Sequence, residues 1–139
     1  MIKTGKSGAV LLRPALLPTY ERGGGARTTP LVTSTLGAAG FINGITAFDP
    51  GVSIPFHSHN CEESVILLEG AAVLEIDAEE HILQVLDTTW IPANVPHRFR
   101  NLSPTKTMKI LWTYASVNAT RTLTETGVTN SVSMEHRNK

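Results

Sequence analysis

The feature that most constrains this chain is a succession of short segments with strand character. From Pro30 onward each apolar run is brief and is bounded by Gly, Pro, Asn or Asp. No window shows the 3.6-residue apolar period that an amphipathic helix requires. We therefore expect an all-β chain, with strands at residues 31–35, 40–48, 53–59, 64–68, 72–76, 81–85, 88–91, 97–101, 107–114 and 120–124.

Many evenly spaced short strands favour an antiparallel barrel or a jelly roll. At 139 residues, with 41% hydrophobic residues, the chain suits one domain with a modest core. We expect an N-terminal arm and loop over residues 1–30, a barrel domain over residues 31–125 and a polar tail over residues 126–139. The loop is placed at residues 21–26, because a run of three glycines there disfavours regular structure.

Charge and hydropathy argue against several classes of partner. Twelve basic and twelve acidic residues cancel, and no basic stripe indicates a nucleic acid or a membrane surface as partner. No apolar run approaches the ~20 residues that span a bilayer. Arg13, Pro14 and Pro18 interrupt the first apolar stretch, which makes it a poor signal-peptide core. The single cysteine, Cys61, agrees with a reducing compartment, and we expect a cytoplasmic protein.

Three histidines and a glutamate have the spacing of a metal site. His57 and His59 are at positions i and i+2 of a strand, so they share a face, with Cα atoms roughly 7 Å apart. Glu63 would lie roughly 13 Å further along a straight strand, so the chain has to turn at residues 60–62 to bring it back. His97 follows a corner fixed by two prolines and can enter from a third strand.

These residues lie in two segments that resemble the two sequence motifs of the cupin superfamily. The first motif, Gly-x5-His-x-His-x3-Glu-x6-Gly, is complete at Gly51, His57, His59, Glu63 and Gly70. The second motif, Gly-x5-Pro-x-Gly-x2-His-x3-Asn, is matched at Pro92, His97 and Asn101. Leu86 and Asn94 stand where the family has glycine. Asn tolerates a left-handed backbone, so Leu86 is the departure that leaves a turn unexplained.

The resemblance implies a double-stranded β-helix, or jelly-roll, barrel with a metal inside it. It implies one divalent transition metal ion (Fe, Mn, Ni, Co or Zn) with four ligands: His57, His59, Glu63 and His97. Two alternatives stay open, Glu62 as the ligand in place of Glu63, and a metal-free cupin in which the histidines are core residues. Cys61 is expected to be a small buried thiol rather than a redox group.

Strand parity predicts which side chains surround the ion. Polar and apolar residues alternate in residues 107–114, so the apolar set should share the inward face. The residue two positions after His97 follows it inward, and a similar alternation is present in residues 40–45. The expected pocket residues are Phe41, Asn43, Phe99, Met108, Ile110, Trp112 and Tyr114. The two remaining histidines, His81 in a turn and His136 in the tail, are expected to be exposed to solvent.

An ion held by three neutral imidazoles and one carboxylate keeps a net positive charge, which favours anionic oxygen donors such as carboxylates, enolates and diketonates. A six-coordinate ion also keeps about two positions for water, substrate or dioxygen. One interpretation is an enzyme with oxygenase, isomerase, decarboxylase or lyase chemistry on a small anionic organic molecule. The other is a non-catalytic small-molecule-binding or sensory cupin. We also expect a homodimer in which the arm, apolar at residues 10–12 and 16–17, packs on the partner.

Overall fold

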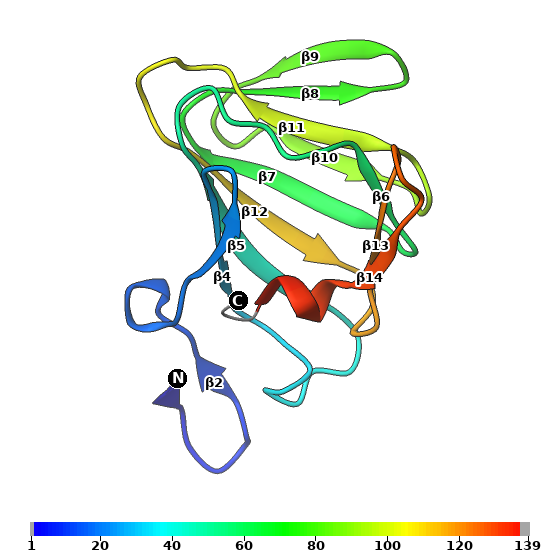
Figure 1. Cartoon of the computed structure of the whole chain (residues 1–139). Helices are drawn as coiled ribbons and strands as arrows, with labels where there is room; N and C mark the ends of the chain where they lie inside the picture. Colours follow the sequence, from blue (N-terminus) through cyan, green and yellow to red (C-terminus); the bar gives the residue numbers. More distant parts are fainter. Residues whose placement is uncertain (1, 137–139) are drawn as a thin grey trace.

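The computed structural model describes residues 2–136 and consists almost entirely of antiparallel strands (Figure 1). Two six-stranded sheets face each other, and a separate two-stranded sheet is formed by β1 (Ile2–Lys3) and β2 (Val10–Leu11). Two short 3-10 helices are present, η1 (Pro14–Leu16) and η2 (Val132–His136). The all-β jelly-roll class expected from the sequence is therefore confirmed. No helix in the described part of the chain is long and apolar enough to cross a membrane.

The first sheet holds the strands that carry most of the core. Its order is β10 (Thr88–Ile91), β7 (Glu63–Glu69), β12 (Met108–Tyr114), β5 (Ile42–Phe48), β4 (Ala26–Pro30) and β3 (Tyr20–Gly23). In the register of this sheet, Tyr114 pairs with Ile42 on one side and with Glu63 on the other. The end of β12 and the beginnings of β5 and β7 therefore lie at the same end of the barrel.

The second sheet carries the histidines. Its order is β14 (Thr129–Ser131), β13 (Thr120–Leu123), β6 (His57–His59), β11 (His97–Asn101), β8 (Ala72–Ile76) and β9 (Glu79–Leu83). His97 pairs directly with His57 across β11 and β6. Residues opposite each other in a ladder point to the same face, so this register places both side chains inside the barrel.

The inner faces of the two sheets form one hydrophobic core. Burial alternates along β12 as the sequence pattern requires, and the residue two positions after His97 is buried with it. Five of the expected inward residues are each at most 6% exposed: Phe99, Met108, Ile110, Trp112 and Tyr114. At about 1.5–3 kcal/mol for each large side chain removed from water, such residues stabilise the barrel more than any surface contact.

The expected inward orientation of Phe41 and Asn43 is wrong. Phe41 is 45% exposed, and the Asn43 side chain accepts a hydrogen bond from the Val32 backbone N–H at 2.9 Å. In β5 the alternate residues are the buried ones, namely Ile42, Gly44, Thr46 and Phe48. This alternation is masked in the sequence because Gly44, one of the inward positions, lies under the Trp112 ring, where a Cβ atom would overlap the ring carbons.

Two local expectations on the N-terminal side are also wrong. Residues 31–35 form bends and turns rather than a strand, and the Leu36 N–H donates to the hydroxyl of Thr33, a local bond that competes with strand pairing. The expected loop at residues 21–26 is instead the β3–β4 hairpin, because Gly24 and Gly25 both adopt positive φ and allow a two-residue turn. Residues 20–30 therefore belong to the first sheet.

The remaining differences concern turns and the tail. His81 lies in β9 and not in a turn, although its side chain is 50% exposed as expected. The strand expected at residues 53–59 is reduced to β6, because Pro55 cannot donate to a ladder. The turn at Leu86, where the second motif has glycine, is formed with the leucine itself in the left-handed region at φ 75°. In the tail, Val132 is fully buried, whereas the side chain of His136 lies outside the described residues.

Candidate metal centre

Three buried imidazoles converge inside the barrel. His57 and His59 point inward from β6, and His97 points inward from the first position of β11. The rings of His57 and His97 have centroids 4.6 Å apart, and one ligand nitrogen from each of the three histidines lies within 4.8 Å of the others. All three side chains are almost completely buried. The three histidines could therefore hold one metal ion.

Backbone carbonyls fix the protonation pattern of all three rings. The Nδ1 atoms of His57, His59 and His97 lie 2.8, 2.9 and 2.9 Å from the carbonyl oxygens of Pro55, Thr120 and Val95, respectively. A carbonyl oxygen can only accept, so each Nδ1 carries the hydrogen and donates it. In the neutral ring the Nε2 atom is then left with a lone pair, which is the form that binds a metal.

Glu63 lies beside two of these rings. Its Oε1 atom lies 2.8 Å from Nε2 of His97 and 3.8 Å from Nε2 of His59, and the side chain is buried. The chain turns at residues 60–62, as the spacing predicted. A carboxylate oxygen and a ring lone pair cannot face each other at 2.8 Å without a cation between them, so this contact demands either a proton or a metal ion.

Glu62 lies outside this group. Its Oε1 atom accepts a hydrogen bond from Nε1 of Trp90 at 2.9 Å on the exposed side of the sheet. Of the two glutamates left open by the sequence, Glu63 is the one beside the imidazoles. Cys61, which precedes the two glutamates in the chain, is half-buried, and burial raises the pKa of its thiol, so the thiol stays protonated at neutral pH and agrees with a structural role.

Electrostatics keep the His57 ring neutral. Burial, followed by the nearby charge of Arg121, lowers the pKa of His57 well below its usual value. A metal then has no proton to displace from this ring near pH 7. Sequence analysis missed Arg121. It pairs with His59 in the β13–β6 ladder and so shares the inner face, a relation that strand parity within one segment does not reveal.

Aromatic rings surround the imidazoles. The ring centroid of Tyr114 lies 4.4 Å from that of His59, and Phe99 makes an edge contact with His97 at 6.1 Å. Trp112 stacks on Tyr114 with a centroid distance of 4.9 Å. These neighbours restrict the access of water and lower the local dielectric, which strengthens interactions with charge at the centre.

The donor set suits a particular group of ions. Three imidazole nitrogens with one carboxylate oxygen are ligands for divalent Fe, Mn, Co, Ni or Zn, whereas Ca and Mg prefer oxygen alone. The residues therefore fit a divalent transition metal.

Comparison with known proteins agrees with the fold and the motif positions. The family model described as "Cupin domain" matches residues 44–114, about half of the chain. This segment contains the three histidines and Glu63.

Two curated relatives are similar in sequence. "Polyketide synthase CurC" of Streptomyces cyaneus is 36% identical over 86 residues, which are 61% of this chain and 55% of the relative. "Protein SchB" of Streptomyces halstedii is 36% identical over 85 residues, 60% of this chain and 61% of the relative. The matched region thus spans somewhat more than half the length of these relatives.

Solved structures share the fold at low identity. The polyketide cyclase RemF from Streptomyces resistomycificus superposes with a TM-score of 0.72 at 20% identity, over 89% of this chain and 85% of that one. A sugar phosphate isomerase from Silicibacter pomeroyi gives a TM-score of 0.73 at 20% identity, over 89% and 88% of the two chains. At this identity the likeness extends to the fold.

Proposed function

Because the chain belongs to the cupin family, we propose that it is a metal-dependent enzyme acting on a small anionic organic molecule. In this proposal one divalent ion is held by four residues: His57, His59, Glu63 and His97. The observation that supports it most is the contact of Glu63 Oε1 with His97 Nε2 at 2.8 Å, together with the Nδ1 anchors of all three rings.

The protein's own residues prepare this centre. The Nδ1 anchors hold each ring so that Nε2 points inward, which reduces the reorganisation needed when the ion binds. Once bound, the ion would supply Lewis acidity for polarising a substrate oxygen or activating water. Phe99 and Tyr114 exclude water from two sides of the rings.

Charge selects the substrate class. Among the residues whose burial is described, Glu63 is the one buried acidic side chain. A divalent ion beside this single carboxylate leaves excess positive charge at the centre. Carboxylates, enolates and 1,3-diketonates would neutralise it. Two polyketide proteins among the relatives agree with an enolisable, oxygen-rich substrate.

The test is turnover by metal-loaded protein. Protein purified without a histidine tag would be loaded with Fe(II), Mn(II), Co(II), Ni(II) or Zn(II). It would then be offered diketone, carboxylate and phenolic substrates, under air and without it. The proposal predicts conversion of at least one class that chelation abolishes and that Glu63→Gln reduces at least tenfold. Tight metal-dependent binding without turnover across the panel would contradict the enzyme and favour a binding or sensory cupin.

We also propose a homodimer formed through the N-terminal arm. The β1–β2 sheet pairs with neither six-stranded sheet, and its neighbourhood exposes Ile2, Leu11 and Leu16 at 41%, 40% and 71%. Apolar surface of this kind favours association with a second copy. Light scattering at micromolar concentration should give a dimer mass, and a monomer mass would refute the assembly. A cytoplasmic location stays a proposal that cell fractionation would test.

A further inference from the structure

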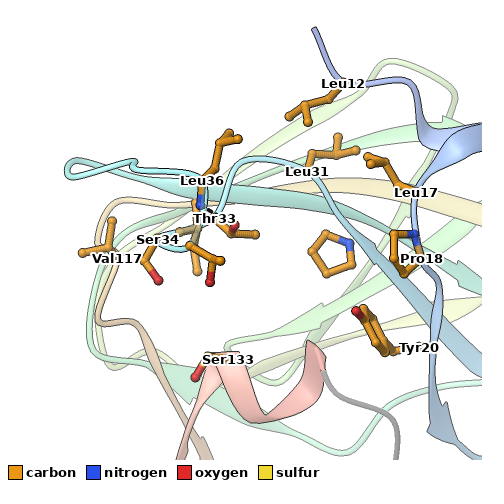
Figure 2. A pocket seen from close by; sticks show the side chains of 13 residues that line it. Leu12, Leu17, Pro18, Tyr20, Leu31, Thr33, Ser34, Leu36, Val117 and Ser133 are labelled. Carbon is orange, nitrogen blue, oxygen red and sulfur yellow. Dashed lines mark hydrogen bonds between the residues drawn. The ribbon is translucent and has the colours of Figure 1, made fainter. Parts of the chain in front are cut away.

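A cavity of about 500 Å³ adjoins the barrel beside the N-terminal arm. Figure 2 shows Leu31 and Leu36, from the segment before β5, facing Ser133 of η2 across this space, with Val117 and Tyr20 on its flanks. The lining comes from parts of the chain that are far apart in sequence. The described side chains of the lining are leucines, prolines, other apolar residues and a few hydroxyl groups, with no charged one among them.

The cavity continues the inner face that carries the metal centre. Ile42 lines the cavity and is buried on the inward parity of β5. Its neighbour across the ladder is Tyr114, whose neighbour on the other side is Glu63. Two strand spacings of ~4.8 Å place the backbone of Ile42 about 10 Å from that of Glu63 along one face of the sheet.

Two further lining residues lie on the same inner face. Tyr20 pairs with Thr28, which is buried and exchanges a hydrogen bond with Thr46 inside the barrel. Pro30 pairs with Gly44, the inward position of β5 under the tryptophan ring. The cavity is therefore the part of the inner surface that extends past the aromatic stack toward the β3 edge.

From this continuity we propose that the cavity binds the apolar body of the substrate, while the anionic oxygens of the same molecule reach the metal centre. The inference rests on the proposed function and narrows its substrate class to an elongated 1,3-dicarbonyl or phenolate with an apolar body that suits the leucine- and proline-rich lining. The volume lies within the ~300–1,000 Å³ of small-molecule sites.

Two ligands with the same chelating head separate the contributions. Pentane-2,4-dione carries the head alone, and a 1,3-diketone with a naphthyl substituent adds a flat apolar body. Calorimetry on the metal-loaded protein should give a Kd for the naphthyl diketone at least tenfold lower than for pentane-2,4-dione.

Filling the cavity should remove that difference. In Val117→Trp and Leu36→Trp the ratio of the two Kd values should fall below threefold, while metal content and the Kd of pentane-2,4-dione stay unchanged. Both original side chains are half-buried at the cavity wall, and two variants guard against one that fails to fold. Ile82→Trp is the matched control, since Ile82 is 68% exposed on β9, and it should keep the wild-type ratio.

Different results would contradict the cavity inference and the proposed function. Equal Kd values for the two diketones in wild-type protein, or a ratio unchanged in both folded cavity variants, would overturn the cavity inference while the metal site stands. If metal-loaded protein binds neither diketone, the proposed function fails, and the cavity inference falls with it.

Discussion

Asn101 closes the end of the barrel opposite the metal centre, and its removal should be costly. The side chain is 1% exposed. Its amide donates to the carbonyl oxygens of Phe48, Asp49 and Lys106 at 3.1, 3.1 and 2.7 Å, and its Oδ1 accepts from the Ser103 N–H at 3.0 Å. Four backbone groups thus depend on one side chain, which ties the end of β5 to the turn after β11.

The magnitude follows from those four contacts. The amide shares two hydrogens among three carbonyl oxygens, so with the Oδ1 contact the side chain makes the equivalent of about three hydrogen bonds at about 1 kcal/mol net each, and buried carbonyls left without a partner add about 1 kcal/mol more. Asn101→Ala should therefore lower the free energy of unfolding by about 4 kcal/mol, or the melting temperature by about 12 °C at roughly 3 °C per kcal/mol. Asn118→Ala, at an exposed position, should change it by less than about 0.5 kcal/mol.

Urea unfolding followed by circular dichroism measures both variants. A loss below about 1 kcal/mol in Asn101→Ala, or equal losses in the two variants, would refute the reasoning that this amide organises the barrel end. The metal centre is formed by other residues, so metal content of folded Asn101→Ala should match the wild type.

Two further substitutions test backbone and packing. Leu86→Gly should stabilise the protein by about 1 kcal/mol, because Leu86 holds φ 75° while 70% exposed, so glycine relieves strain and forfeits little burial; unchanged or lower stability in thermal unfolding would contradict this. Gly44→Ala should destabilise by about 2–3 kcal/mol, because the added Cβ overlaps the Trp112 ring. It should also shift the tryptophan fluorescence, and wild-type stability and emission would show that the ring does not occupy that space.

The sequence predicted those parts of the structure that depend on residue type and short spacing. Alternation in β12 identified its buried face because its inward residues are all large and apolar. The rule failed in β5, whose inward positions include Gly44 and Thr46. There a neighbouring tryptophan takes the space of one side chain and hydrogen-bonds to the hydroxyl of the other, so neither looks like a core residue in sequence.

In the candidate centre too, short-range spacing predicted some contacts, and contacts between distant strands were not predictable from it. The spacing of His57, His59 and Glu63 reflects one strand and one turn, so their approach was predictable from the sequence, whereas the place of His97 on another strand was expected from the resemblance to the cupin motifs. Arg121 was not predictable, since its position depends on the pairing of β13 with β6 across about sixty residues of chain. The cavity likewise depends on how the arm, the segment before β5 and η2 pack together, and no local pattern encodes that packing.

Metal occupancy in His97→Ala and His81→Ala tests the central claim most directly. Both histidines are in strands, but His97 is buried 2.8 Å from Glu63, whereas His81 is exposed on β9. After incubation of untagged protein with a divalent ion and removal of the excess, elemental analysis should find near-stoichiometric metal in His81→Ala and far less in His97→Ala. Chelation should lower the melting temperature of wild type and of His81→Ala but barely change that of His97→Ala. Equal occupancy in the two variants, or a wild type that retains no metal, would contradict the account.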